Sequence, residues 1–220
     1  MSGMNKYDYA EDVLRVFEPD GVWFTSDTHF YHDNILRYCN RPFRDIAEMN
    51  DTLVRNWNEV VPPEGVVFHL GDFAFGSPGQ WNDILSRLNG QIYLILGNHD
   101  MKQIRQGFMG RFAHVTQQML IRVGGQPVVL NHNPFLAYGG AYRNVWQLFG
   151  HVHSGPLSGK GKDGDSGSGK DLPRLSMLFP NQYDVGVDNN DFRPVSFAEV
   201  KRIIEAQREA AGGQGGAKNK

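Results

Sequence analysis

The sequence predicts an α/β (α+β) protein built from two packed β-sheets with helices on the outside. Short apolar strands alternate with helical patterns in the first half of the chain, whereas the second half is richer in strands. The composition, with 40% hydrophobic and 21% charged residues over 220 residues, is that of an ordinary globular domain. A formal net charge of -2 excludes the overall basic character of a nucleic-acid coat protein, but it is compatible with a local basic patch.

The first half contains three expected strands, at residues 22–25, 66–70 and 92–96. Each is a short apolar run that ends in a polar turn, which is typical of strands in an α/β sheet. Apolar residues at helical spacing predict a helix over residues 45–60. A second helix is expected over residues 77–88, because a Ser-Pro pair opens it and an Asn-Gly pair closes it.

The second half begins with an expected β-hairpin. Residues 119–123 and 127–130 read as strands on either side of a glycine pair. Further strands are expected near residues 145–149 and 183–187. Near the end, Ser196-x-x-Glu199 forms a capping-box pattern ahead of apolar residues, which predicts a final structural helix.

We expect a single domain over residues 1–211, followed by a disordered tail at residues 212–220. Residues 154–170 are rich in glycine, serine and charged residues and have few apolar anchors, so they predict a mobile surface loop. This loop follows a pair of histidines, which makes a substrate-contacting lid conceivable. A solvated insertion is the simpler interpretation.

Cys39 is the single cysteine, so the chain can form neither an intramolecular disulfide nor a thiolate metal cluster. This fits a reducing compartment. Residues 1–18 lack the uninterrupted apolar stretch of a signal peptide, and no run reaches membrane-spanning length. We therefore expect a cytoplasmic protein with no membrane partner.

Polar clusters directly follow several of the expected strands, where α/β folds collect their functional groups. The clusters are Asp27-x-His29, Gly71-Asp72, Gly97-Asn98-His99-Asp100, Asn131-His132 and Gly150-His151-Val152-His153. Neutral imidazole is the commonest nitrogen ligand for divalent transition metals. Nitrogen and oxygen donors without sulfur predict a site for Mn, Fe, Zn, Co or Ni, whereas so many nitrogens disfavour Mg.

The spacing within two clusters suggests how they could chelate an ion. Asp27 and His29, like His151 and His153, are two residues apart, and such residues project to the same side of an extended strand end. Each pair is therefore expected to face one cavity. Glycine is expected to let the backbone approach the ions closely and to permit unusual turns. The glycines beside the ligands are Gly71, Gly97 and Gly150.

These five blocks, in this order, resemble the pattern DxH, GD, GNHD, H and GHxH of the calcineurin-like metallophosphoesterases, in particular the small bacterial and phage-type members. The resemblance spans residues 27–153, and each block alone is weak whereas all five in order are specific. It implies a four-layer αββα sandwich of two mixed β-sheets flanked by helices. One departure is Asn131 before His132, where many members carry a small residue or Thr.

The resemblance also implies a role for each matching position. Two divalent ions would be held in neighbouring sites, the first by Asp27, His29 and His153 and the second by Asn98, His132 and His151. The carboxylate of Asp72 would bridge the two ions. His99 would lie outside the metal shell near the leaving-group oxygen, and Asp100 would orient it by hydrogen bonding.

The implied reaction is hydrolysis of a phosphate ester. The two cations would share a hydroxide that attacks phosphorus in line, and protonated His99 would donate a proton to the departing oxygen. The cations would also neutralise charge on the phosphate oxygens. We expect Mn²⁺ as the metal, with Fe, Zn, Ni or Co as alternatives.

We expect the substrate to be a small-molecule or nucleotide phosphate ester, and a nucleic acid is also conceivable. A phosphodiester is favoured over a phosphoprotein because the chain has little extra sequence for docking a protein. The alternative is a phosphomonoesterase acting on nucleotides, metabolites or phosphoproteins. A non-catalytic scaffold of the same fold is disfavoured, because no ligand position is empty.

Other residues near the clusters have two interpretations each. His32 could contact the substrate phosphate or be a solvated loop residue. The trio Arg37, Arg41 and Arg44 could grip a nucleotide, although a solvated loop with ordinary ion pairs is simpler. His69 and His114 are expected to be structural.

Overall fold

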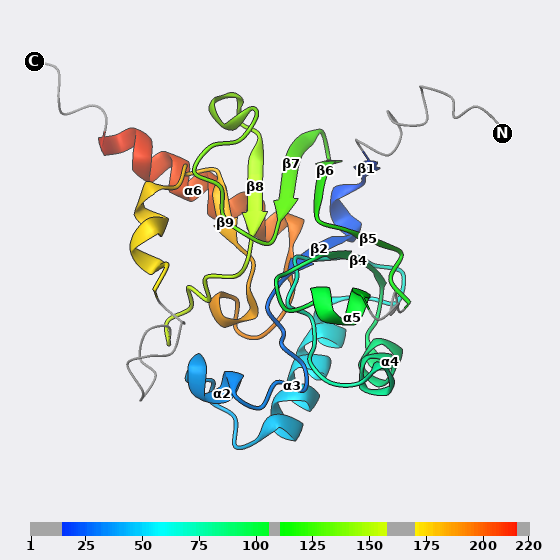
Figure 1. The fold of residues 1–220 in the computed structure, drawn as a ribbon. Helices are drawn as coiled ribbons and strands as arrows, with labels where there is room; N and C mark the ends of the chain where they lie inside the picture. The colour runs from blue at the N-terminus through cyan, green and yellow to red at the C-terminus, as the bar shows by residue number, and fades with distance from the viewer. Residues whose placement is uncertain (1–14, 106–110, 158–169, 215–220) are drawn as a thin grey trace, which may run out of the picture.

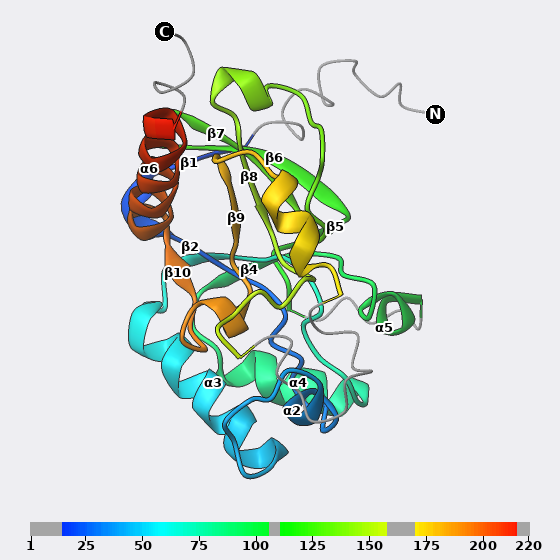
Figure 2. The ribbon, with the colours of Figure 1, turned by 90° about the vertical axis from the view of Figure 1, so that its left-hand side faces the viewer.

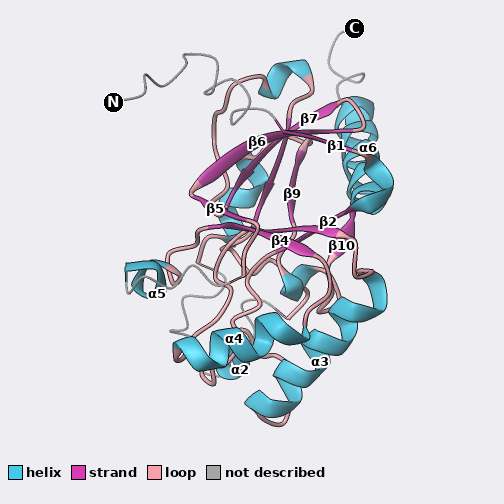
Figure 3. Cartoon of the chain, turned by 90° about the vertical axis from the view of Figure 1, so that its right-hand side faces the viewer, coloured by secondary structure: helices cyan, strands magenta, loops and turns pink. Residues whose placement is uncertain are grey.

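The computed structural model describes residues 15–105, 111–157 and 170–214 of the chain. Its strands form two five-stranded sheets. Sheet A contains, in spatial order, β1 (Arg15–Phe17), β6 (Gln118–Val123), β7 (Gln126–Asn131), β8 (Trp146–Phe149) and β9 (Gln182–Asp184). Sheet B contains β10 (Val195–Ser196), β2 (Val22–Thr25), β3 (Val66–His69), β4 (Gln91–Ile95) and β5 (His114–Thr116). The two sheets are stacked, as Figure 3 shows in magenta.

Both sheets are mixed, as expected. In sheet B, β2, β3, β4 and β5 are parallel and only the pairing of β10 with β2 is antiparallel. In sheet A the hairpin of β6 and β7 is antiparallel, whereas β1 pairs with β6, β7 with β8, and β8 with β9 in parallel. A bridge between Ser26 and Gly186 joins the end of β2 to the segment after β9. The carboxyl ends of β2, β3, β4 and β5 and those of β7, β8 and β9 therefore meet at one edge.

Five α-helices lie in the described part of the chain. They are α2 (Ile35–Tyr38), α3 (Ile46–Val60), α4 (Pro78–Arg87), α5 (Met101–Arg105) and α6 (Phe197–Gln214). Short 3-10 helices are η1 (Pro19–Gly21), η2 (Ala141–Arg143), η3 (Leu172–Met177) and η4 (Val187–Asn189). Helices α3 and α4 cover the outer face of sheet B, with α2 beside them (Figures 1 and 2). Helices α3 and α4 begin as the sequence indicates, with Asp45 and Ser77 accepting capping hydrogen bonds.

Two apolar clusters hold these layers together. One lies between sheet B and the helices and contains Trp57 and Trp81, both fully buried. The other fills the space between the sheets, where Phe24 of sheet B faces residues of sheet A such as Ile121. Helix α6 adds Ile204 to this second cluster and lies along one edge of the sandwich (Figure 3). The rigid layers fix the strand ends that carry the polar loops.

The prediction of two mixed sheets flanked by helices is confirmed. The last expected strand is shorter than predicted, because the chain enters η4 at Val187. Helix α6 continues to Gln214, past the expected domain boundary at residue 211. Residues 158–169 of the glycine-rich loop and residues 215–220 of the tail lie outside the described residues, so the single domain and its tail stay predictions. No helix in the described ranges has both the length and the apolar character needed to cross a membrane.

Candidate metal centre

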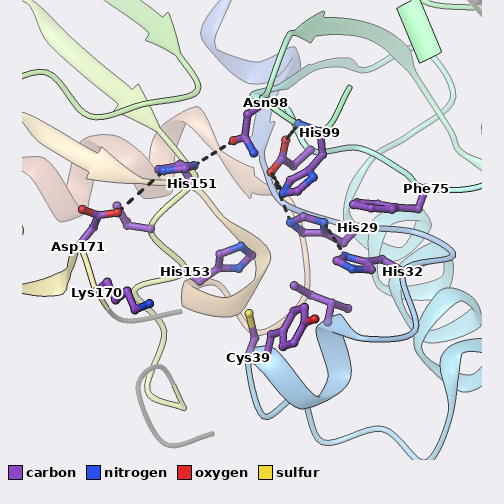
Figure 4. Close-up of a pocket in the computed structure, with 14 residues that line it drawn as sticks. His29, His32, Cys39, Phe75, Asn98, His99, His151, His153, Lys170 and Asp171 are labelled. Atoms are coloured by element: carbon purple, nitrogen blue, oxygen red, sulfur yellow. Dashed lines mark hydrogen bonds and ion pairs between the residues drawn. The ribbon is translucent and has the colours of Figure 1, made fainter. Parts of the chain in front are cut away.

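The five polar blocks predicted from the sequence come together in one cavity of about 630 Å³. The loops after β2, β3 and β4 supply one side, and the loops after β7 and β8 supply the other. Figure 4 shows the histidines of these loops pointing toward one another. The expected ligands that line the cavity are His29, Asp72, Asn98, His151 and His153, and the other two, Asp27 and His132, are buried next to them.

The first group of donors consists of Asp27, His29 and His153. Asp27 Oδ1 lies 3.9 Å from His29 Nε2 and 3.7 Å from His153 Nε2. Atoms that share a metal ion at about 2.1 Å lie about 3.0 to 3.5 Å apart, so a small inward shift would complete a shell. Asp27 Oδ1 and His29 Nε2 are buried without a hydrogen-bond partner among the described residues. These orphaned atoms fit a cation.

The second group consists of Asn98, His132 and His151. Asn98 Oδ1 lies 3.1 Å from both His132 Nε2 and His151 Nδ1. These separations match those of ligands on one ion. His132 Nδ1 donates to the carbonyl of Leu70 at 2.7 Å, which leaves the lone pair of Nε2 facing the group.

Asp72 lies between the two groups. Its Oδ2 atom is 3.6 Å from His29 Nε2 in the first group and 3.6 Å from His132 Nε2 in the second. The other oxygen, Oδ1, accepts the backbone N–H of His99 at 2.9 Å, which holds the carboxylate in place. One oxygen at equal distance from both donor groups is the arrangement that a bridging ligand needs.

The charges of the site also favour cations. Burial and the neighbouring Asp27 carboxylate raise the pKa of Asp72 to about 7. Burial alone would raise the pKa of Asp27 as well, but the His153 and His132 imidazoles lower it overall. Burial lowers the pKa of His29, which favours the neutral imidazole that binds metals. Two buried carboxylates repel each other unless positive charge is placed between them.

The backbone of the ligand loops differs from the extended geometry predicted from spacing. Asp27 and His29 have φ angles of 57° and 50°, and His151 and His153 have 72° and 47°. Asp72 is also left-handed, with φ of 55°. Residues other than glycine rarely adopt this backbone conformation, and they keep it only where the surrounding structure enforces it. The paired ligands do share one cavity, but tight left-handed turns rather than strand alternation bring them there.

Three glycines allow these loops to approach one another. A Cβ atom at Gly97 would collide with the Asp72 carboxylate, and one at Gly150 would collide with Asp27. Gly71 has φ of 96° and lies against the backbone of Gly97. The sequence predicted close approach to the ions, whereas the observed contacts are with the ligand carboxylates and the adjoining loop.

Arg41 and Asp188 support the first group, and neither was predicted to do so. His153 Nδ1 donates to Asp188 Oδ2 at 2.7 Å, which turns Nε2 toward Asp27. Arg41 binds both oxygens of Asp188 at 2.9 and 2.8 Å. Burial would raise the pKa of Asp188, but Arg41 and His153 lower it, so the carboxylate is ionised.

The interpretation of Arg41 as part of a solvated basic loop is wrong. Its side chain is buried, and it donates to the carbonyls of Thr28 at 2.9 Å and Asp27 at 2.7 Å. Arg41 therefore clamps the backbone of the first ligand loop to Asp188. Arg44 fits the simpler interpretation, since it is exposed and pairs with Glu48.

The predicted partnership of His99 and Asp100 differs from the structure. His99 lines the cavity with its side chain 45% exposed and its Nε2 3.9 Å from Asp72 Oδ2. Asp100 is fully buried, and its oxygens accept the backbone N–H groups of Gly97, Asp72 and Phe73. Among the described residues, Asp100 thus holds two ligand loops together instead of orienting the His99 imidazole.

Two other histidines that the sequence left aside lie near the centre. His69 is buried and hydrogen-bonded to Thr28 at 2.9 Å, the structural role expected for it. His32 lies at the cavity, where its Nδ1 is 3.2 Å from Nδ1 of His29 and its ring stacks on Phe75 with centroids 3.8 Å apart. A hydrogen bond between these nitrogens directs the Nε2 atom of His29 into the first group.

Comparison with known proteins agrees with this geometry. Residues 21–166, more than half of the chain, match the calcineurin-like phosphoesterase family. The chain belongs to this family. Within this calcineurin-like phosphoesterase, clusters of Asp and His side chains that could hold metal ions lie where the family motifs place them, including Asp27 with His29 and His153, and Asp27 with Asp72 and His132.

Several relatives share most of the chain. It is 33% identical over 186 residues to the uncharacterized protein MJ1445 of Methanocaldococcus jannaschii, covering 84% of this chain and 91% of that one. It is 29% identical to the gene 66 protein of Mycobacterium phage D29, covering 83% and 95% of the two chains. A solved structure, the protein of unknown function AQ665 from Aquifex aeolicus, is similar with a TM-score of 0.58, 23% identity and coverage of 83% and 98%. This last likeness supports the fold alone.

Proposed function

We propose that this calcineurin-like phosphoesterase hydrolyses phosphodiesters with the help of two divalent ions, Mn²⁺ being favoured. The observation that carries the proposal is the position of Asp72 Oδ2, 3.6 Å from a nitrogen of each donor group. Asp27, His29 and His153 would hold the first ion, and Asn98, His132 and His151 the second. When bound, the pair would lower the proton affinity of water and withdraw charge from the phosphate.

The protein's own groups would prepare the site for that chemistry. The Asp188 carboxylate and the backbone carbonyl of Leu70 accept hydrogen bonds of 2.7 Å from the Nδ1 atoms of His153 and His132, which fixes the orientation of the two rings. The buried walls exclude water around Asp27 and His29, which strengthens their attraction for positive charge.

His99 is our candidate for the proton donor to the leaving group. Its imidazole is half exposed in the cavity, outside both donor groups and 3.9 Å from the shared Asp72 oxygen. Burial and the nearby His132 lower the pKa of His99, so that protonated His99 would be a stronger acid toward an alkoxide while a smaller fraction of it carries the proton at neutral pH. With Asp100 engaged by backbone amides, His99 would act without a carboxylate partner at that position.

The competing function is hydrolysis of phosphomonoesters. The two functions can be compared directly with the Mn²⁺-loaded protein, whose bound metal is quantified. The measurement is the turnover of bis-p-nitrophenyl phosphate, a diester, and of p-nitrophenyl phosphate, a monoester. We expect the diester to be hydrolysed more efficiently. Faster turnover of the monoester would favour the competing function, and no turnover of either by a metal-loaded protein would favour a scaffold of the same fold.

The role of His99 has its own test. His99→Asn should lower turnover of a diester with a poor leaving group by about 10²-fold, and that of an activated aryl diester much less. His114→Asn is the matched control, because His114 lies on β5 and does not line the cavity. Equal losses on both esters would exclude His99 as the proton donor.

We also propose that the protein is cytoplasmic.

A further inference from the structure

The cavity over the candidate metal centre is the middle of a longer groove. A second cavity of about 490 Å³ shares His151, Val152 and Asp171 with it. A third cavity, of about 480 Å³, shares Phe75, Asn98 and His99 with it. Figure 4 shows Asp171 and His151 on one side of the centre and Phe75 on the other. Among the described residues, two further cavities therefore adjoin the one that contains the donor groups, on opposite sides of it.

The second cavity, here called the apolar arm, is lined mainly by hydrophobic side chains of the loop after β7 and of η3. Leu136 and Met177 are 59% and 64% exposed, although large apolar side chains are usually covered. The rest of its apolar lining is Pro134, Val152, Leu175 and Leu178, and its polar members are Asn133, His151, Asp171 and Arg174. Exposed hydrophobic side chains gathered on one cavity beside a polar centre indicate a ligand-binding surface.

The middle cavity has a wall of aromatic rings, here called the ring wall. His32 and Phe75 are nearly parallel, with an angle of 14° between their planes and centroids 3.8 Å apart. His99 lies 5.0 Å from Phe75, and Tyr38 lies 6.1 Å from His32. Half-buried rings of this kind stack favourably with planar groups.

The third cavity, here called the polar arm, differs in character. Ser77, Lys102 and Gln103 line it together with Gly76 and Pro78. Lys102 is exposed and supplies positive charge on this side of the centre. An anionic group that continues beyond the scissile phosphate would be attracted there.

We propose that the groove binds a nucleoside phosphodiester, with a base in the apolar arm, the scissile phosphate over the donor groups and the remaining chain passing the ring wall toward the polar arm. This inference rests on the proposed phosphodiesterase activity and specifies its substrate. A phosphomonoester would fill only the middle cavity. A diester with a sizeable group on each side of phosphorus uses all three cavities, and a base matches an apolar arm better than an ionic group would.

The test compares three diesters with the same leaving group, so that the chemical step is matched. They are the p-nitrophenyl ester of thymidine monophosphate, bis-p-nitrophenyl phosphate and hexyl p-nitrophenyl phosphate. We expect kcat/KM for the thymidine ester to exceed that of each other diester by about tenfold, since a base in the apolar arm would remove the exposed apolar surface of Leu136 and Met177 from water. A higher value for the hexyl ester would assign the apolar arm to an alkyl chain and overturn the proposal.

A variant of the apolar arm makes the test specific. Leu136→Ser combined with Met177→Ser should lower kcat/KM for the thymidine ester about fivefold or more and leave unchanged that of methyl p-nitrophenyl phosphate, which has no group large enough to enter the apolar arm. Val16→Ser is the matched control, because Val16 is 66% exposed on β1 and lines none of the three cavities.

The possible failures are distinguishable. Equal kcat/KM for the three diesters, with no effect of the double variant, would overturn the substrate inference and leave phosphodiester hydrolysis standing. Hydrolysis of none of them by the Mn²⁺-loaded protein would overturn the proposed function and this inference together.

Discussion

The two donor groups of the candidate metal centre differ in how firmly the protein holds them. In the first group, Asp27 and His29 are fully buried, and His153 is 11% exposed and fixed by Asp188. In the second group His132 is buried, whereas Asn98 is exposed and His151 is 35% exposed. All three members of the first group are thus built into the core, whereas two of the three members of the second group face the groove. We infer that the first ion would bind more tightly than the second. The affinity for the second ion would depend more strongly on whether substrate is bound.

The largest effect is expected from the substitution that removes the carboxylate shared by the two groups. Asp72→Asn keeps the shape of the side chain but lowers its charge, so both sites should weaken together. Turnover of bis-p-nitrophenyl phosphate should fall by about 10³-fold, which corresponds to several kcal/mol of transition-state stabilisation. Calorimetric titration with Mn²⁺ should show weaker binding at both sites. A loss confined to one site would show that Asp72 does not serve both groups.

The next prediction separates the groups. Asp188→Asn removes the charge that orients His153 and pairs with buried Arg41, so the affinity of the first site for Mn²⁺ should fall by about 10- to 100-fold. The free energy of unfolding should also decrease, because Arg41 keeps its buried charge with a weaker partner. Calorimetry measures the first effect and urea unfolding the second.

As the control for Asp188→Asn, the affinity of the second site for Mn²⁺ should stay within a factor of about two. The circular dichroism spectrum, recorded at the same temperature, should be unchanged. Equal weakening of both sites would mean that the two groups are not held independently.

A smaller effect is expected at His32, which contacts the first group from the groove side. His32→Phe keeps the ring beside Phe75 but removes the hydrogen bond with His29, so Mn²⁺ affinity at the first site should fall about fivefold, as for the loss of about 1 kcal/mol. His32→Asn offers a side-chain acceptor again and should recover part of the affinity. If both variants bind Mn²⁺ like the parent protein, the contact between the two histidines does not orient His29.

The smallest effect is expected on the open side. Asp171 is 36% exposed and lies 4.0 Å from His151 Nε2, so Asp171→Asn should change Mn²⁺ affinity by less than about threefold. The same substitution at buried Asp188 makes this a matched pair. An equal effect at the two positions would remove the distinction between a closed and an open group.

The contrast between the two groups also marks what the sequence could predict. The order of the blocks from Asp27 to His153 predicted which side chains lie together, because motif spacing and strand ends are local properties. The left-handed turns at the ligands were not predictable from spacing, since an extended strand end offered a simpler explanation for the same pairs.

Contacts between distant segments were also missed. Arg41 pairs with Asp188, which lies 147 positions further along the chain, and no local pattern reports such a contact. The one available signal was that Asp188 follows the expected strand near residues 183–187, as the other polar clusters follow theirs. The family resemblance implied that Asp100 orients His99, but the buried carboxylate accepts hydrogen bonds from backbone amides instead.

In the proposed centre, side chains from five loops would hold two divalent ions on either side of Asp72. The most direct measurement is a crystal structure of the protein soaked in Mn²⁺, with anomalous scattering recorded at the manganese edge. The account predicts two anomalous peaks, one bounded by Asp27, His29 and His153 and one by Asn98, His132 and His151, with an oxygen of Asp72 touching both. Peaks elsewhere, or none with the ligand loops ordered, would contradict it.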